Sequence, residues 1–363
     1  MSVNEMKPRN ELIIKRPDDW HLHLRDEDMM RAVLPYTVEL YGRAIIMPNL
    51  RPPVRTVQDL EAYRQRILDA LCPGHGFQPL MTLYLTDETP PAEIRLAKNK
   101  DLLAAVKLYP VGVTTHSEHG VTAIKKVYRV LEVMQELNMP LSIHGEVNDP
   151  GVDIFDREAA FIDRELDPLR KDFPELKIVM EHVTSRTGVD YVRSAEKGLG
   201  ATVTPHHLLI NRNNIFAGGL NPHMFCLPVA KREADRLAIR KAAVSGDSRF
   251  FFGSDSAPHR RIDKEKAGGA AGVFNMPTAL SSIVQVFEEE ASFDNLEAFL
   301  SLNGARFYGL PPNPDTITLR KTASAIPTAE TIPVGEDTVK VFQTREPLFW
   351  KVVEGLRRTT DQK

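Results

Sequence analysis

The chain has 363 residues, of which 42% are hydrophobic, so it can form two ordinary domains or one large barrel with a sizeable core. A formal net charge of −3 argues against nucleic acid as a main partner, and no apolar run approaches the roughly 18 residues needed to span a bilayer. Only two cysteines, Cys72 and Cys226, and a polar N-terminus without an apolar signal core are typical of a soluble cytoplasmic protein in a reducing compartment.

Eight apolar, β-branched runs recur along the chain, and amphipathic stretches separate them. The predicted strands cover residues 11–16, 43–47, 80–85, 104–108, 141–144, 177–181, 201–204 and 249–253. The predicted helices cover residues 58–71, 121–137, 156–171, 188–197, 232–245, 277–290 and 296–307. Strands that alternate with helices, each strand a near-continuous apolar run, predict an α/β fold with a parallel (β/α)8 TIM barrel.

The texture of the sequence changes after Leu310, where prolines and then threonines become frequent. We therefore expect the barrel core to cover about residues 11–310. The tail, 311–363, is expected to form a short C-terminal extension packed on the barrel, because it is too short for a second substantial domain. The chain is predicted to be a single domain over 1–363.

The first ligand-type motif is His21-Leu22-His23, which we place after the strand predicted at 11–16. Side chains alternate faces along a strand, so His21 and His23 are expected to point the same way. Two neutral imidazoles side by side suit one zinc ion. An isolated His-x-His is more often a pair of satisfied polar residues, so the rest of the chain must decide.

Later strands end in further ligand-type residues, namely Lys107, His144, His182 and Asp255. Each has a structural explanation: the histidines could be satisfied core residues, and Asp255 could cap a helix. In a parallel barrel, however, the active site lies at the C-terminal ends of the strands. Because all of these residues fall at that end, the sequence predicts that they converge on one metal centre.

Lys107 is the unusual member, because it follows an otherwise apolar strand. Its amine could simply extend to solvent. An ammonium group would be repelled by metal cations, but a neutral amine can react with carbon dioxide to form a carbamate. A carbamate is a carboxylate on a long stem, and its two oxygens could bridge two metal ions.

Taken together, these motifs resemble the amidohydrolase superfamily and, within it, the short, single-domain bacterial dihydroorotase family. The resemblance runs from about residue 12 to residue 310. It is carried by DWHLHLR at 19–25, MPN at 47–49, VKLYP at 106–110, HGE at 144–146, EH at 181–182, DSAPH at 255–259 and AAGVFN at 270–275.

The resemblance implies two Zn²⁺ ions per subunit. The implied ligands of one ion are His21, His23 and Asp255. Those of the other ion are His144 and His182. Carboxylated Lys107 (N6-carboxylysine) would bridge both ions, as would a hydroxide. Asp255 would also be catalytic, taking the proton of the hydroxide and passing it to the leaving nitrogen.

The resemblance further implies the reversible cyclisation of N-carbamoyl-L-aspartate to L-dihydroorotate, a step of de novo pyrimidine synthesis. Arg25, Asn49 and His259 would bind the substrate carboxylate, which suits the planar fork of an arginine. The backbone of Leu227 and Ala271 would meet the pyrimidine ring.

The implied lid is the loop at 111–116, in which Thr114 and Thr115 would cap the bound substrate. Its glycine and small polar residues suit a mobile segment. An ordinary exposed loop after a barrel strand would, however, have the same composition.

Two alternatives remain open. One is another cyclic amidase, such as a hydantoinase or an allantoinase; members of that branch usually carry a β-rich flanking domain, and only 20 residues precede His21. The other is a catalytically silent scaffold, which would be expected to lack the metal ligands. The resemblance also implies a homodimer, although no feature of the sequence demands one.

Overall fold

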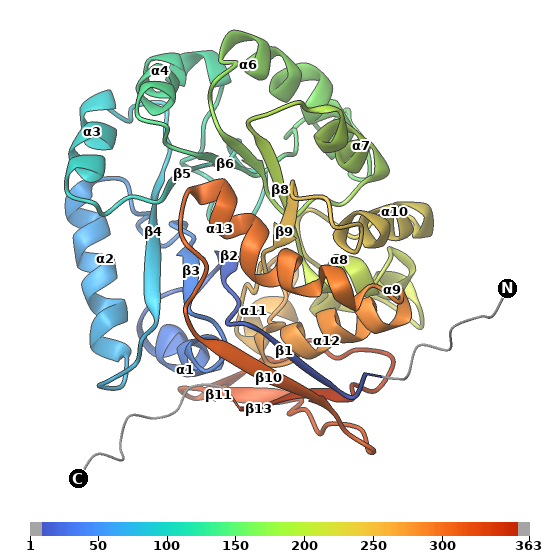
Figure 1. Ribbon diagram of the computed structural model, residues 1–363. Coiled ribbons are helices and arrows are strands. Elements are labelled where there is room, and N and C mark those ends of the chain that lie inside the picture. Colours follow the sequence, from blue (N-terminus) through green and yellow to red (C-terminus); the bar gives the residue numbers. More distant parts are fainter. Residues whose placement is uncertain (1–8, 355–363) are drawn as a thin grey trace, which may run out of the picture.

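The structure is a computed structural model, and it describes residues 9–354. Eight parallel strands stand side by side in chain order and form its centre (Figure 1). They are β2 (Asp19–Leu22), β3 (Arg43–Ile46), β4 (Gln78–Tyr84), β5 (Ala105–Leu108), β6 (Leu141–Ile143), β7 (Ile178–Met180), β8 (Leu199–Val203) and β9 (Phe250–Phe252). A parallel bridge between Leu22 and Ser256 joins the last strand to the first. The sheet is therefore nearly closed, which confirms the predicted TIM barrel.

Helices cover the outside of the barrel (Figure 1). The α-helices are α1 (Glu27–Val38), α2 (Val57–Ala70), α3 (Pro91–Asn99), α4 (Tyr128–Glu136), α5 (Arg157–Phe161), α6 (Asp167–Asp172), α7 (Arg186–Ser194), α8 (Pro205–Leu209), α9 (Asn213–Phe216), α10 (Glu233–Ala243), α11 (Arg261–Lys264), α12 (Met276–Glu289) and α13 (Asn303–Tyr308). Shorter helical turns are η1 (Ile124–Val127), η2 (Ile162–Leu166), η3 (Pro222–Met224), η4 (Phe293–Asn295) and η5 (Ala298–Leu302). Within residues 9–354, no helix combines the length and the apolar character needed to cross a membrane.

The start of α2 follows from local chemistry. At the start of α2, the Thr56 hydroxyl accepts a hydrogen bond from the Asp59 amide, and the Asp59 carboxylate accepts one from the Thr56 amide. This reciprocal capping satisfies two amides that a helix start leaves unpaired.

The prediction of a barrel strand at 11–16 was wrong. Glu11–Lys15 forms β1, which pairs antiparallel with β10 (Thr316–Lys321) outside the barrel. Exposure alternates along β1: Ile13 is 65% exposed and Ile14 only 5%. Such alternation is typical of an antiparallel strand with one face in water, whereas a strand of a parallel barrel is buried on both faces. All four residues of β2, the true first barrel strand, are buried.

The C-terminal extension is rich in strands. β10 also pairs with β13 (Trp350–Glu354), and β11 (Thr331–Val334) forms a hairpin with β12 (Asp337–Lys340). These strands lie together with β1 on one side of the barrel (Figure 1). The buried Trp350 donates from its indole N–H to Glu288 of α12 at 3.0 Å, so the extension is tied directly to a barrel helix.

One glycine lets the barrel bring its strand ends close together. A Cβ on Gly253, just after β9, would stand 2.8 Å from Cβ of Thr202 and 3.0 Å from Cβ of His21. Side-chain carbons do not approach so closely. Gly253 therefore leaves the room in which His21 can reach the barrel mouth.

Candidate active site

The C-terminal ends of the barrel strands surround a cavity of about 20 Å³. Eleven of the thirteen predicted site residues line it. They are His21, His23, His144, His182 and Asp255 of the predicted metal ligands, and Arg25, Asn49, Thr114, Thr115, Leu227 and Ala271 of the predicted substrate-binding residues. The other two, Lys107 and His259, lie next to residues that line the cavity. Nζ of Lys107 is 5.0 Å from the ring centre of Tyr109, which lines the cavity, and His259 contacts Arg25. The fold thus brings all of the predicted residues together.

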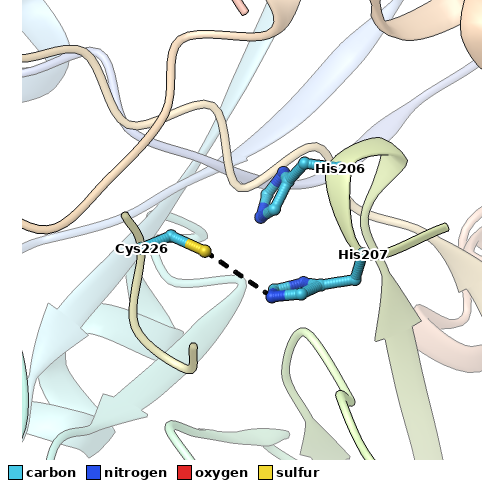
Figure 2. A group of neighbouring side chains, drawn as sticks. All are labelled: His206, His207 and Cys226. Carbon is cyan, nitrogen blue, oxygen red and sulfur yellow. Dashed lines mark hydrogen bonds between the residues drawn. The ribbon is translucent and has the colours of Figure 1, made fainter. Parts of the chain in front are cut away.

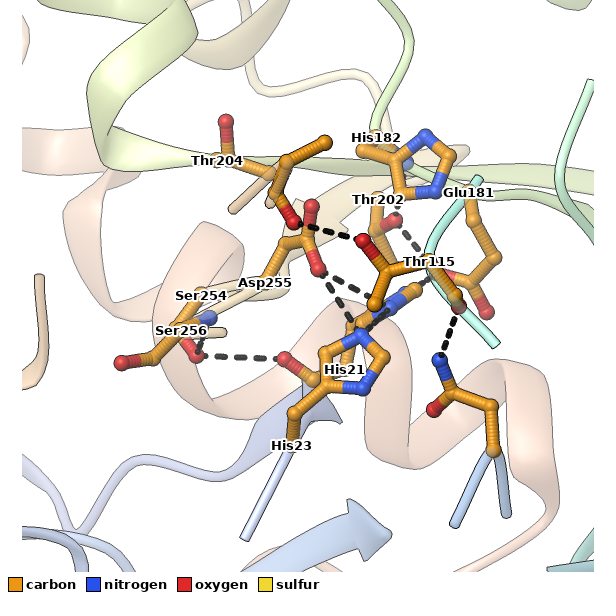
Figure 3. A network of polar contacts seen from close by, with 12 residues as sticks. His21, His23, Thr115, Glu181, His182, Thr202, Thr204, Ser254, Asp255 and Ser256 are labelled. Atoms are coloured by element: carbon orange, nitrogen blue, oxygen red, sulfur yellow. Dashed lines mark hydrogen bonds and ion pairs between the residues drawn. The ribbon is translucent and has the colours of Figure 1, made fainter. Parts of the chain in front are cut away.

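Three donor atoms form a compact triangle. Nε2 of His21, Nε2 of His23 and Oδ1 of Asp255 stand 3.1–3.3 Å apart, and the three side chains point toward one another (Figure 3). Ligand atoms about 2.0–2.1 Å from a tetrahedral zinc ion stand about 3.3–3.4 Å apart. The triangle therefore has the dimensions of one face of a metal site.

The hydrogen bonds and charges around His21 favour a cation at this triangle. Its Nδ1 donates to the buried Glu181 carboxylate at 2.7 Å, so a neutral ring has only a lone pair at Nε2. That lone pair faces the Asp255 carboxylate at 3.3 Å. Although burial acts in the opposite direction, Glu181 and Asp255 raise the pKa of His21. A metal ion would take the place of the extra proton that the site attracts.

Asp255 is the anion of this group. Burial by itself would raise its pKa, but the contacts with His21 and His23 hold the pKa well below the usual value. The carboxylate is therefore ionised at neutral pH, as a metal ligand must be.

A second pair of histidines lies beside the first group. The ring centres of His144 and His182 are 4.8 Å apart, and that of His182 is 5.1 Å from His21. Nε2 of His144 donates to Glu146 at 2.8 Å, which leaves its Nδ1 as a lone pair. Burial lowers the pKa of both His144 and His182, so both rings are neutral and able to bind a metal.

Lys107 is buried among these groups. Its side chain is 0% exposed, and its Nζ has no hydrogen-bond partner among the described residues. Burial lowers its pKa to about 8, against the opposing pull of Glu181 and Asp255. A buried amine without a partner is costly. The lowered pKa favours the neutral amine, which is the form of lysine that can react with carbon dioxide.

Three of the site residues adopt backbone conformations that side chains rarely favour. The φ angles are +59° at Arg25, +41° at His182 and +42° at Asp255. Residues other than glycine seldom occupy this region, and such strain clusters at functional sites. The packing of the barrel mouth holds these side chains inward in spite of it.

The predicted carboxylate-binding residues meet at the rim. Nη2 of Arg25 lies 3.0 Å from Nε2 of His259, and that nitrogen also lies 2.9 Å from the Ala271 carbonyl oxygen. Because the carbonyl only accepts, His259 must donate to it, which leaves the Arg25 N–H facing another donor. A substrate carboxylate would accept from Arg25 and relieve this conflict.

The loop at 111–116 is docked over the cavity. Oγ1 of Thr115 donates to the Ala271 carbonyl at 3.2 Å, and Nδ2 of Asn49 donates to the Thr115 carbonyl at 3.1 Å. Thr114 and Thr115 separate the inner cavity from an outer pocket of about 520 Å³, because both residues line both spaces. The inner cavity has about the volume of one water molecule, so a larger molecule can enter only if part of this lining moves.

The sequence prediction gave no role to several supporting residues. Glu181 and Glu146 accept from the site histidines, and Oδ1 of the buried Asp19 accepts from the amides of His21 and Ser254. Such partners orient metal-binding histidines. A signal was present, since each of these acids lies within two residues of a predicted ligand.

A second group of histidines and a cysteine lies outside the lining of the cavity. His206, His207 and Cys226 are buried, and their donor atoms lie within 4.8 Å of one another (Figure 2). Sγ of Cys226 is 3.6 Å from Nε2 of His207. The sequence analysis did not foresee this group.

The hydrogen bonds of these residues do not favour a metal site, although Nε2 of His206 has no partner among the described residues. Nδ2 of Asn275 donates to the Ser254 carbonyl and lies 3.0 Å from Nδ1 of His206, which must accept. The proton of neutral His206 is therefore on Nε2. Nε2 of His207 donates to the Pro228 carbonyl at 3.0 Å. The Nε2 atoms of His206 and His207 therefore both carry protons, whereas a metal ligand would need a lone pair there.

Comparison with known proteins shows clear relatives. The sequence profile of the amidohydrolase family matches residues 13–348. A dihydroorotase of Chelativorans sp. (strain BNC1) is 55% identical over 341 residues, which cover 94% of this chain and 99% of the relative. The crystal structure of Saccharomyces cerevisiae dihydroorotase in complex with 5-fluoroorotic acid is similar with a TM-score of 0.87 at 35% identity, over 96% of this chain and 100% of that one. An L-hydantoinase from Arthrobacter aurescens has a TM-score of 0.72 at 15% identity, over 93% and 87% of the two chains, which is a likeness of fold alone.

Proposed function

Because the chain belongs to the amidohydrolase family and, within it, to the dihydroorotases, we propose that it interconverts N-carbamoyl-L-aspartate and L-dihydroorotate in pyrimidine synthesis. The observation that carries this proposal is the position of Arg25. Its guanidinium lies between the metal-sized triangle of donor atoms and His259, with Nη1 3.3 Å from Nδ1 of His23. An anion-binding group beside a metal centre suits a cyclic amide that carries a carboxylate.

We propose a binuclear zinc centre at the barrel mouth. His21, His23 and Asp255 would hold one ion, and His144 and His182 the other. Lys107, carboxylated at Nζ, would supply the anion shared by both. Two metal ions so placed lower the pKa of a water molecule and polarise the amide carbonyl.

Arg25, Asn49 and His259 would orient the ring by binding its carboxylate. Two N–H groups of Arg25 can contact the two oxygens of a carboxylate at once. The backbone at Leu227 and Ala271 would border the ring, because both residues line the same cavity. This arrangement would present one amide carbonyl of the ring to Asp255.

Asp255 would carry the proton of the reaction. In the hydrolytic direction, Oδ of Asp255 accepts the proton of the attacking water and donates it to the ring nitrogen as the C–N bond breaks. In the biosynthetic direction, it removes that proton from the carbamoyl nitrogen as the nitrogen bonds to the carboxyl carbon, and it then donates the proton to the oxygen that leaves as water. A positioned acid–base group typically contributes 10²–10⁴-fold to the rate.

The docked loop would exclude bulk water during this exchange. With Thr115 bonded to Ala271, the inner cavity is separated from the outer pocket. Opening of the loop would admit the substrate, and closing would complete the site.

The test is an assay with dihydroorotate and hydantoin side by side, with Asp255→Asn as the inactive control. We expect turnover of dihydroorotate, and a loss of about 10²–10⁴-fold in the folded Asp255→Asn protein. Turnover of hydantoin with none of dihydroorotate would contradict the proposal and favour a hydantoinase. Near-normal kcat in Asp255→Asn would remove this residue from the mechanism.

A further inference from the structure

Lys264, the last residue of α11, has an unusual environment. Its side chain is 4% exposed, yet its three hydrogen bonds all go to backbone carbonyls and none to a carboxylate. Nζ donates to the oxygens of Phe225 at 2.8 Å, Ala270 at 2.9 Å and Gly272 at 2.6 Å. An ammonium group has three N–H donors, so all of them are used.

The three carbonyls belong to two segments that border the inner cavity. Phe225 lies two residues before Leu227, and Ala270 and Gly272 flank Ala271. Leu227 and Ala271 both line the cavity. The amide of Gly272 also donates to the Phe225 carbonyl at 3.0 Å, so the two segments meet where Lys264 joins them.

This junction continues to the lid. The Ala271 carbonyl accepts from Thr115 at 3.2 Å and from His259 at 2.9 Å. The segment that Lys264 holds is therefore the one on which the docked loop rests. Loss of the Lys264 hydrogen bonds would therefore affect both the backbone around Ala271 and the position of the docked loop.

A purely structural role for Lys264 is poorly favoured. Burial disfavours its charge and lowers its pKa to about 8, and an apolar side chain would avoid that cost. A buried ammonium, however, can hold three carbonyls of two irregular segments at once, of which the Phe225 carbonyl also accepts from the Gly272 amide.

We propose that Lys264 is a positioning residue, which holds the 225–227 and 270–272 segments together as one wall for the pyrimidine ring and as the dock for the lid. This inference rests on the proposed function in its choice of ligand. It assigns Lys264 to binding and not to chemistry, because Nζ faces the backbone of the two segments and not the metal ligands.

The test compares Lys264→Met with Lys241→Met in the full chain. Both variants remove one positive charge, but Lys241 is exposed on α10 and lines neither the inner cavity nor the outer pocket. We expect Lys264→Met to raise the KM for dihydroorotate at least about tenfold with a smaller change in kcat, since charge-assisted bonds to both segments are lost. Lys241→Met should stay within about twofold of the wild type.

Hydrogen exchange supplies a readout that needs no activity. In the wild type, the Gly272 amide should be protected by its bond to Phe225, and Lys264→Met should speed its exchange at least about tenfold while amides in α2 keep their rates. If Lys264→Met does not fold, Lys264→Arg carries the test, because a guanidinium keeps the charge but cannot direct three N–H groups from one nitrogen.

A folded Lys264 variant with an unchanged KM and unchanged Gly272 exchange would overturn the proposal, and so would a loss confined to kcat. If the wild-type chain turned over no dihydroorotate, the proposed function would fail. The exchange experiment would still decide whether Lys264 holds the two segments together.

Discussion

Nδ1 of His21 lies 2.7 Å from Oε2 of Glu181, and both side chains are buried. The same carboxylate accepts hydrogen bonds from Ser142 and Thr202. Burial by itself would raise the pKa of Glu181, but His21 and Lys107 lower it, so the group is ionised. Glu181 therefore fixes the proton of His21 on Nδ1 and turns the Nε2 lone pair toward Asp255.

We expect Glu181→Gln to weaken metal binding about 10–100-fold, because outer partners of metal-binding histidines typically contribute this much. The affinity for Zn²⁺ would be measured by competition with a chelator. Glu132→Gln, on the exposed face of α4, serves as the control and should bind as the wild type does. Equal zinc affinity in the two variants would show that Glu181 does not orient His21.

Arg25→Lys should lower kcat/KM for dihydroorotate by at least about tenfold, although the positive charge is kept. A lysine cannot reproduce the two-pronged contact with a carboxylate, and hydrogen bonds to charged groups contribute roughly 1.5–3 kcal/mol. Steady-state kinetics would measure the change. An unchanged kcat/KM would mean that the Arg25 side chain does not bind the substrate.

Lys107→Ala should lose metal and activity together, because it removes the anion proposed to serve both ions. Short carboxylic acids added to Lys107→Ala should restore part of each by filling the space of the missing carbamate. Lys107→Arg should not be rescued, since a guanidinium forms no stable carbamate and fills the space with charge. A fully active Lys107→Arg enzyme, or an unmodified amine beside two bound metals, would contradict carboxylation.

The lowered pKa of Lys107 predicts how the metal-free protein is reactivated. Carbon dioxide reacts with the neutral amine, and a pKa of about 8 makes about one tenth of it neutral at pH 7 and most of it neutral at pH 9. At constant dissolved carbon dioxide, the rate of reactivation by Zn²⁺ should rise about tenfold between these values and then level off. A rate that keeps rising above pH 10 would indicate an ordinary lysine pKa.

Much of the barrel could be predicted from the sequence, because most of its strands are short apolar runs and several of its helices are periodic. The strand β2, which contains Asp19 and His21, and the helices α1 and α3 were not predicted. Seven of the eight predicted barrel strands are present in the structure. The site could be predicted for a related reason. A parallel barrel places all strand ends at one mouth, so residues such as His144 and His182 meet wherever their strands lie in the chain. The ligand roles, the two zinc ions and the homodimer stay predictions.

The tertiary structure alone decided which distant segments pair. β1 has the apolar content of a barrel strand, but it pairs with β10, about 300 residues later. Glu181 is partnered with His21, and Lys264 with carbonyls on two separate segments. A sequence pattern reports the local tendency of a residue to form a strand or to seek burial. It does not report which groups satisfy the hydrogen bonds of a buried residue, because those groups come from whatever parts of the chain the fold brings beside it.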